Sequence, residues 1–282
     1  MSGKVSIIIP CYNDGKYLPE AVASAKAQTY PDIEIIIVDD HSTDTETQKV
    51  LQRAAGGNVV VVKTPEGKKG LPAARNTGIS VAGGDYILPL DADDTIYPTY
   101  VEKTLAVLEG NPDVAVCGSG VRFFGLRHND WQQPEYSATG LVLEEFKLVC
   151  TALYRRRDWE RVGGYDESLT LGKEDMVFWL DMLQDGRRIV ILPEVLFFYR
   201  IKPNSMTAAT GTGPTERDRL TAMYAARPEV FQRHTLDFME LCARYRDEKA
   251  RLTCLVSWNI LSPLFRLEWR IRQRIKRWFG RA

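Results

Sequence analysis

The sequence predicts an α/β fold in which helices cover both faces of a doubly wound, mostly parallel β-sheet. First, four short apolar segments alternate with segments of helical composition near the start of the chain. This alternation is typical of βαβ units. Second, the apolar segments lack polar alternation, as expected of strands that are buried on both faces. Third, polar residues follow the strand ends, where ligands bind in open α/β sheets.

The expected elements follow one another closely up to residue 90. Strands are predicted at residues 5–9, 33–38, 59–62 and 86–90, and helices at residues 17–28, 43–55 and 72–82. Pro10 closes the first strand, Asp39 and Asp40 close the second, and Pro72 suits the first turn of its helix. Because the carboxyl ends of parallel strands share one edge, the polar clusters after them are expected to converge there.

The pattern loosens in the second part of the chain. A strand is predicted at residues 114–117, a surface segment at 125–140, a helix at 176–183 and a strand at 188–199. The Gly-Thr-Gly-Pro stretch at residues 211–214 marks a boundary. We therefore expect one domain over residues 1–207, made of halves 1–115 and 116–207, and a helical C-terminal extension over 208–282.

Composition excludes several functional classes. The 282 residues contain 37 Lys and Arg against 37 Asp and Glu, so we expect no nucleic-acid partner. The five scattered cysteines include no CxxC pair, which argues against a zinc site or a disulfide frame. The sequence contains no apolar stretch of 18 residues and no N-terminal signal pattern, so a cytoplasmic protein is expected.

The C-terminal segment differs from the rest in charge. Between Arg266 and Arg281, seven Lys or Arg and one acid give +6, which leaves −6 for the remainder. Apolar residues at helical spacing lie opposite the arginines on a helical wheel. This pattern predicts a peripheral helix on an anionic membrane surface, at the inner face of the cell membrane. The alternative is a docked C-terminal helix with solvated arginines.

An acidic cluster follows the fourth strand directly, with Asp91, Asp93 and Asp94 in four residues. Carboxylates held this close raise one another's pKa, and a divalent cation would remove that cost. Oxygen ligands of this kind suit Mg²⁺ or Mn²⁺. Taken alone, the cluster is equally compatible with a solvated acidic loop.

Further motifs accompany this cluster in a fixed order. They are Pro10-x-Tyr12-Asn13, Val38-Asp39-Asp40-x-Ser42-x-Asp44, Ala74-Arg75-Asn76-x-Gly78, Leu90-Asp91-Ala92-Asp93-Asp94, Gly163-Gly164-Tyr165-Asp166, Glu174-Asp175 and Tyr199-Arg200. Together they resemble the inverting family-2 glycosyltransferases of GT-A fold, over residues 4–207. The resemblance implies transfer of a sugar from a nucleotide-sugar donor to a hydroxyl, in cell-surface or extracellular polysaccharide biosynthesis. The acceptor would be a glycan, a lipid-linked molecule or a protein.

The resemblance places the donor in a Rossmann-like half, residues 1–115. The implied donor-binding residues are Pro10, Tyr12, Asn13, Asp39, Asp40, Arg75, Asn76, Asp91 and Lys202. Tyr12 would flank the base, and Asp40, or Asp39, would accept the base N–H, which favours uracil or thymine and hence a UDP-sugar. The alternative is sheet-edge packing for Tyr12 and turn capping by the aspartates.

Arg75 and Asn76 would lie on the helix that Pro72 opens. Arg75 would clamp a phosphate and Asn76 would order the acidic loop. The alternative is an exposed helix arginine beside an asparagine whose hydrogen bonds are satisfied within the fold.

The resemblance also implies Mn²⁺ or Mg²⁺ at the acidic cluster. Asp93 would ligate the ion, Asp91 would contact ribose or the metal shell, and Asp94 could take over either task. Many metal-dependent relatives carry His two residues after the Tyr-Arg pair, whereas this chain has Lys202. A lysine cannot ligate a metal, but it could reach a diphosphate oxygen.

The catalytic base is expected in the acceptor half, residues 116–207. The resemblance carries this role onto Asp175, and the neighbouring Glu174 would raise its pKa and make it a better base. The alternative is that both acids only complement the dipole of the following helix.

Two other functions remain open at this point. The run from Asp91 to Thr95 fits the DxDxT pattern of haloacid-dehalogenase-like phosphatases, with Asp91 as nucleophile and Asp93 as acid/base. Lys202 is also compatible with a pseudo-transferase that binds nucleotide sugar without turnover.

Overall fold

The computed structural model describes residues 3–133, 148–170, 172–203, 216–236, 239–240, 243–244 and 246–249. The chain divides into two compact units, Met1–Gln232 and Arg233–Ala282. The predicted basic helix between Arg266 and Arg281 and the boundary at residues 211–214 lie outside the described residues. In the part of the chain that is described, no helix has the length and apolarity needed to cross a membrane.

The predicted elements of the first half are present, with small shifts at their ends. They are β1 (Val5–Cys11), α1 (Leu18–Lys26), β2 (Ile33–Asp39), α2 (Thr45–Ala54), β3 (Val59–Lys63), α3 (Leu71–Val81) and β4 (Tyr86–Pro89). β1 pairs in parallel with both β2 and β4, and β2 pairs in parallel with β3. The carboxyl ends of these four strands therefore share one edge of the sheet.

The second half is less regular. It contains β5 (Thr95–Ile96), α4 (Tyr100–Gly110), β6 (Val114–Gly125), β7 (Asn129–Trp131), β8 (Leu153–Arg155), α6 (Arg156–Val162), α7 (Glu174–Met182), β9 (Arg188–Ile201), α8 (Glu216–Ala226) and α9 (Pro228–Arg233). The strand predicted at residues 114–117 extends to Gly125, because β6 pairs in parallel with β9 along its length. The helix predicted to start at residue 176 begins at Glu174, so both acids lie in its first turn.

The described strands form one sheet in the order β3-β2-β1-β4-β8-β6-β9-β5, and β7 pairs with β6. The longest ladders are parallel, whereas the antiparallel pairs of β8, β5 and β7 are short. The predicted mostly parallel α/β sheet is thus confirmed. β8 lies antiparallel between β4 and β6 and joins the two halves of the chain into one sheet.

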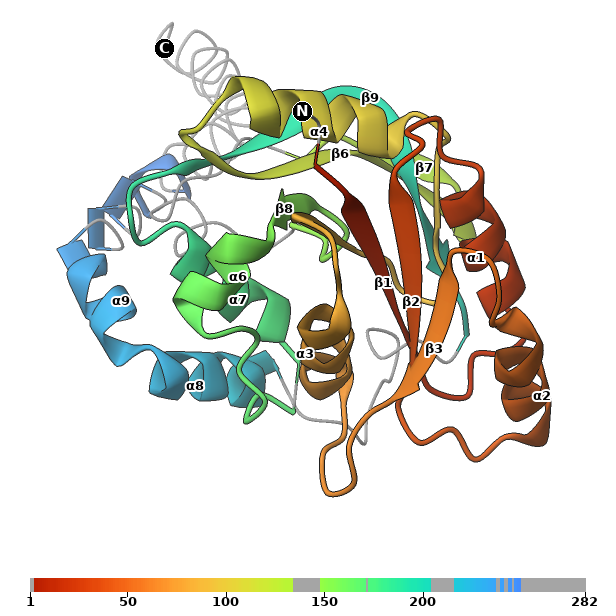
Figure 1. Ribbon diagram of the computed structural model, residues 1–282. Coiled ribbons are helices and arrows are strands. Elements are labelled where there is room, and N and C mark those ends of the chain that lie inside the picture. The colour runs from red at the N-terminus through yellow and green to blue at the C-terminus, as the bar shows by residue number, and fades with distance from the viewer. Residues whose placement is uncertain are drawn as a thin grey trace, which may run out of the picture. The chain divides into compact units, whose positions relative to one another are not determined.

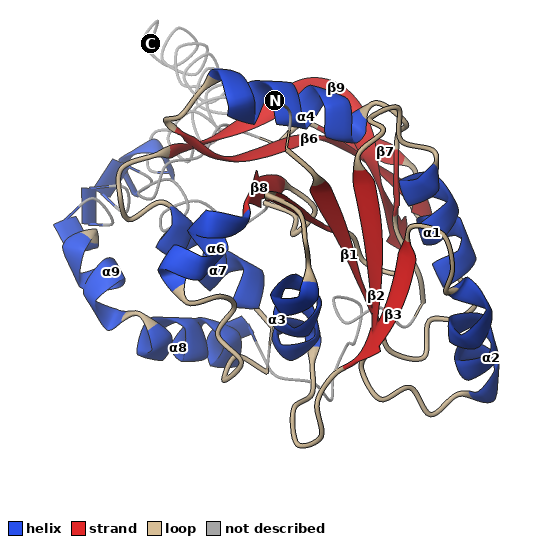
Figure 2. Cartoon of the chain, viewed as in Figure 1, coloured by secondary structure: helices blue, strands red, loops and turns tan. Residues whose placement is uncertain are grey.

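Two apolar cores lie on opposite faces of the sheet. Side chains alternate along a strand, so Ile7 and Ile9 pack on one face and Ile8 packs on the other. The Ile7 face meets α1, α2 and α4, and the Ile8 face meets α3 and α7. In Figures 1 and 2, α1 and α2 lie on one side of the sheet and α3 on the other. This burial on both faces explains why the strands read as continuous apolar runs.

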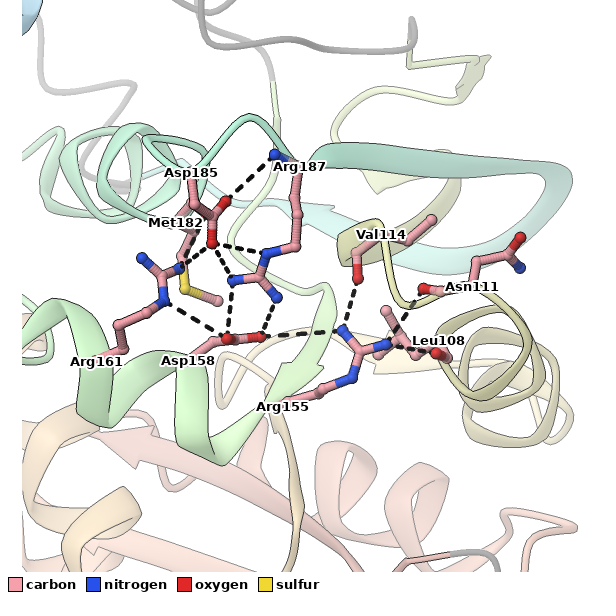
Figure 3. A network of polar contacts seen from close by, with 9 residues as sticks. All are labelled: Leu108, Asn111, Val114, Arg155, Asp158, Arg161, Met182, Asp185 and Arg187. Carbon is pink, nitrogen blue, oxygen red and sulfur yellow. Dashed lines mark hydrogen bonds and ion pairs between the residues drawn. The ribbon is translucent and has the colours of Figure 1, made fainter.

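A network of ion pairs and hydrogen bonds joins α4, β6, β8, α6 and the loop before β9 (Figure 3). Arg187 binds both carboxylate oxygens of Asp158 at 2.8 Å, and Arg161 approaches the same carboxylate at 3.7 Å. Arg155 donates to the carbonyls of Leu108 at 2.5 Å and Val114 at 2.7 Å. Because Arg155 pairs with Tyr86 at the start of β4, this network lies at the amino end of that strand.

Candidate active site

The polar residues predicted to converge do meet at the carboxyl edge of the sheet. The backbone N–H of Asp40, after β2, donates to the carbonyl of Cys11, at the end of β1, at 2.9 Å. The N–H of Thr64, after β3, donates to the carbonyl of Asp39 at 3.0 Å, and Leu90, after β4, donates to Ile8 at 2.9 Å. One edge therefore carries the loops that follow all four parallel strands.

Tyr12, Asp40 and Thr64 follow the ends of β1, β2 and β3 at this edge. The Tyr12 ring is 44% exposed, and Lys69 Nζ lies 5.1 Å from its centre. Asp40 is buried, and its Oδ2 accepts the N–H of Gly70 at 2.8 Å. Its Oδ1 and the Thr64 hydroxyl are buried and have no partner among the described residues. Buried polar atoms without partners are costly, so these two atoms are candidates for contact with a ligand.

Thr64 was not predicted from the sequence. The signal that could have found it is its position directly after the third strand, at the edge where the other polar clusters lie.

Other residues of the predicted donor site shape the loops around Tyr12, Asp40 and Thr64. Asn13 adopts a left-handed backbone with φ 55°, and its Oδ1 accepts the N–H groups of Thr43 and Asp44 at 2.8 and 2.9 Å. Asp39 accepts the N–H of Ser42 at 2.8 Å. Pro10 is buried within β1. These contacts hold the loops after β1 and β2 together.

Arg75, on α3, links the two halves of the site. Its Nη2 donates to Asp91 Oδ1 at 3.0 Å and its Nη1 donates to Glu174 Oε1 at 2.7 Å. The side chain is 1% exposed, so the alternative of an exposed helix arginine is wrong. Its Nε is buried without a partner among the described residues. Arg75 thus ties the acidic turn after β4 to the first turn of α7.

Asp175 lies next to this link, in the first turn of α7. Its Oδ1 accepts the N–H of Met176 at 2.8 Å. Burial, together with the negative charges of Glu174 and Asp91, raises the pKa of Asp175 to about 7, although the Arg75 charge opposes the shift. A carboxyl group with a pKa near neutrality is suited to accept a proton in catalysis.

The acidic turn is fastened to the end of β9. The N–H of Asp94 donates to the carbonyl of Asp91 at 3.1 Å, which closes the turn. Asp94 is buried, and its Oδ1 accepts the N–H of Arg200 at 2.7 Å. Burial and the nearby Asp93 raise the pKa of Asp94 well above its usual range. Asp93 faces Lys202, whose Nζ lies 2.9 Å from Asp93 Oδ2 and 2.6 Å from Asp14 Oδ1.

The three predicted metal ligands are each engaged by another group of the protein. Asp91 binds Arg75 and lies 3.5 Å from Cys150 Sγ, Asp94 binds the Arg200 backbone, and Asp93 pairs with Lys202. Over the described ranges, no group of three or more His, Cys, Asp or Glu side chains is placed to hold a metal ion. In this arrangement the three carboxylates do not fit Mn²⁺ or Mg²⁺. Metal binding at this cluster stays a prediction.

Asn76 fastens the Gly-Gly-Tyr-Asp turn instead of contacting the acidic turn. Its Oδ1 accepts from Trp159 Nε1 at 3.1 Å and from the N–H of Tyr165 at 2.9 Å. Its Nδ2 donates to the carbonyl of Tyr165 at 2.8 Å and to Glu167 at 3.1 Å. Gly164 has φ +80°, and an added Cβ would come within 2.8 Å of Asn76 Oδ1, so only glycine fits there.

A mostly parallel sheet with a polar site at the carboxyl edge of its first strands is typical of nucleotide-binding α/β enzymes. The chain belongs to Glycosyl transferase family 2, which it matches over residues 6–177, more than half of its length. The haloacid-dehalogenase-like alternative is therefore not retained.

Relatives and solved structures agree with this assignment. Glycosyltransferase GlyG of Streptococcus pneumoniae is 31% identical over 229 residues, which cover 73% of each chain. The uncharacterized glycosyltransferase EpsJ of Bacillus subtilis is 30% identical over 82% of this chain and 71% of its own. The crystal structure of S. aureus TarS in complex with UDP-GlcNAc matches with a TM-score of 0.67 at 22% identity. That match covers 81% of this chain and 66% of the TarS chain, and it confirms the predicted GT-A fold.

Proposed function

We propose that this glycosyltransferase moves a sugar from a UDP-sugar to a hydroxyl acceptor with inversion at the anomeric carbon. The observation that carries the proposal is the position of Asp175. Its carboxyl group has a pKa raised to about 7. The helix turn that carries it is joined to the carboxyl edge of the sheet by the contacts of Arg75 with Glu174 and Asp91.

The donor base would bind at Tyr12, Asp40 and Thr64. The unpartnered Asp40 Oδ1 would accept the imide N–H of uracil, a charge-assisted hydrogen bond, and the Thr64 hydroxyl would meet a neighbouring polar atom of the base. The exposed Tyr12 ring would flank the plane of the base. The UDP-GlcNAc and UDP complexes of TarS, which shares the fold, support the choice of a UDP-sugar.

The acceptor side would use Asp175 as the general base. The acceptor oxygen attacks the anomeric carbon and its proton passes to an Asp175 carboxylate oxygen, while the bond from that carbon to the diphosphate oxygen breaks. UDP leaves with the electron pair of the broken bond, on the face opposite the attack. Glu174 would hold Arg75 and raise the basicity of its neighbour.

The diphosphate that leaves carries negative charge, which a cation has to neutralise. Members of the family generally use a divalent metal, and the sequence predicts Mn²⁺ or Mg²⁺ at Asp93 with Asp91 and Asp94. Because these carboxylates are already engaged, no step is assigned to the ion.

The biological setting is proposed by analogy with the family. The enzyme would work in the cytoplasm, at the inner face of the cell membrane through the segment from Arg266 to Arg281, in assembly of cell-surface glycans. Its acceptor would be a glycan, a lipid-linked molecule or a protein.

The experiment is to incubate the purified chain with UDP-, dTDP-, GDP- and CMP-sugars and a panel of acceptors, and to measure nucleotide release. UDP-sugar should be consumed, UDP should stabilise the chain in thermal unfolding, and an α-linked donor should give a β-linked product by anomeric proton coupling. Equal use of GDP- and UDP-sugars would contradict the base site, and an α-linked product would contradict inversion. Binding of UDP-sugar without release would point to the pseudo-transferase.

A further inference from the structure

Lys202 lies against Asp93, the carboxylate predicted to ligate a divalent cation. It follows β9 directly, and its side chain is 19% exposed. Its ammonium lies 2.6 Å from Asp14 Oδ1 and 2.9 Å from Asp93 Oδ2, between the loops that follow β1 and β4. An ion coordinated by Asp93 Oδ2 would have to displace this ammonium, because two cations cannot share one close contact.

The surrounding residues hold the lysine in this position. Arg200, two residues earlier, donates from Nε to the carbonyl of Asp93 at 2.8 Å and stacks at 4.8 Å from the centre of the Tyr17 ring. The same ring lies 5.2 Å from Lys202 Nζ. β5 and β9 also pair beside the acidic turn, through Thr95 and Phe198. These contacts hold the ammonium in place at the end of β9.

Lys202 is the cation that faces the carboxylates of Asp93 and Asp14. Arg75 pairs instead with Asp91 and Glu174. Two of the three N–H donors of the ammonium serve Asp93 and Asp14, which leaves the third for a diphosphate oxygen. Lysine is a regular phosphate ligand that acts as a compact point charge.

We propose that Lys202 supplies the cation that neutralises the donor diphosphate, so that this chain binds UDP without a divalent metal. The proposal rests on the proposed function, because it presupposes a UDP-sugar donor.

The test measures UDP affinity of the full chain by calorimetry, once with EDTA and once with Mn²⁺. The unaltered chain should bind UDP in EDTA with an affinity within about threefold of that in Mn²⁺. Lys202→Met should lower the affinity in EDTA by about 10- to 100-fold, the value of a hydrogen bond to a charged group. Lys202→Arg, which keeps the charge, should retain most of the affinity in EDTA.

Lys103→Met is the matched control. Like Lys202, Lys103 forms an ion pair, in this case with Glu194 at 2.6 Å. The pair is exposed and lies outside the site. Its loss should leave UDP affinity unchanged, and thermal unfolding of each variant shows whether it folds. If Lys202→Met does not fold, the UDP affinities of the unaltered chain and of Lys202→Arg in EDTA still test the proposal.

Two outcomes overturn the proposal in different ways. If the unaltered chain binds UDP only with Mn²⁺, and Lys202→Met binds UDP at least as tightly under that condition, the lysine is a placeholder that the metal displaces. If UDP binds under neither condition while the chain is folded, the proposed donor itself is wrong, and the role of Lys202 falls with it.

Discussion

Two buried arginine–carboxylate networks lie at opposite ends of β4, and they differ in how completely their groups are paired. At the amino end, Arg187 binds both oxygens of Asp158, and Arg155 donates to three backbone carbonyls. At the carboxyl end, Arg75 binds Asp91 and Glu174 but leaves its Nε without a partner among the described residues.

The difference extends to the neighbours of each network. Five buried side-chain atoms lack a partner in the described part of the chain, and three of them belong to the candidate site: Asp40 Oδ1, Thr64 Oγ1 and Arg75 Nε. The pKa of Asp175 is also raised to about 7 there. Because full pairing stabilises a fold whereas unpaired groups and shifted pKa values cost stability, we assign the first network to folding and the second to function.

The largest expected effect is that of Asp175→Asn. The amide keeps the shape of the side chain but cannot accept the acceptor proton. We expect transfer to fall by roughly 10²- to 10⁴-fold, the usual contribution of a positioned base, while UDP affinity stays unchanged. Steady-state kinetics and calorimetry measure the two quantities. Near-normal turnover would show that the base is another residue and would remove the main functional distinction between the networks.

Arg187→Met tests the opposite network. It leaves the buried Asp158 without its bidentate partner, so the free energy of unfolding should fall by about 1.5–3 kcal/mol. Turnover per folded molecule should not change. The control is Arg188→Met, which breaks the exposed pair with Asp113 and should cost about 0–1 kcal/mol. Urea unfolding supplies the energies, and a loss of turnover in folded Arg187→Met would contradict a purely structural role.

The pH dependence of transfer should report Asp175. A base acts when ionised, so the fraction of active enzyme falls as pH drops below the pKa of about 7. We expect kcat/KM to decrease about tenfold per pH unit on the acid side and to level off above neutrality. A profile measured from about pH 5 to about pH 9 would reveal this limb. A flat profile down to about pH 5 would mean that Asp175 has an ordinary pKa or does not act as the base.

Glu174→Gln should have the smallest effect. It removes a negative charge that raises the pKa of Asp175, so the acid limb should move to lower pH. Glutamine can still accept a hydrogen bond from Arg75, so we expect the loss of rate to stay within about tenfold. The pH profile of the variant is the measurement. A shift to higher pH would show that Glu174 acts mainly by holding Arg75.

The local sequence pattern was sufficient to predict the first four strands of this protein. Strands buried on both faces read as unbroken apolar runs, so β1, β2, β3 and β4 were predictable to within one or two residues. The long β6 was not, because residues 118–125 are held in the sheet by pairing with β9, about 70 residues further along the chain. Likewise, nothing local distinguishes the buried Arg155 from the two arginines that follow it.

The same division holds for the site. The sequence motifs identified the residues at the carboxyl edge, because the ability of a side chain to bind a nucleotide or to accept a proton depends on its own chemistry. Their partners came only with the tertiary structure: Arg75 on Glu174, Asn76 on the turn at Tyr165, and Lys202 on Asp93. Each of these contacts joins residues far apart in the chain, and a charge takes its role from the group that lies against it. The sequence thus determined which chemical groups this protein carries, and folding decided which of them were paired and which were left unpaired.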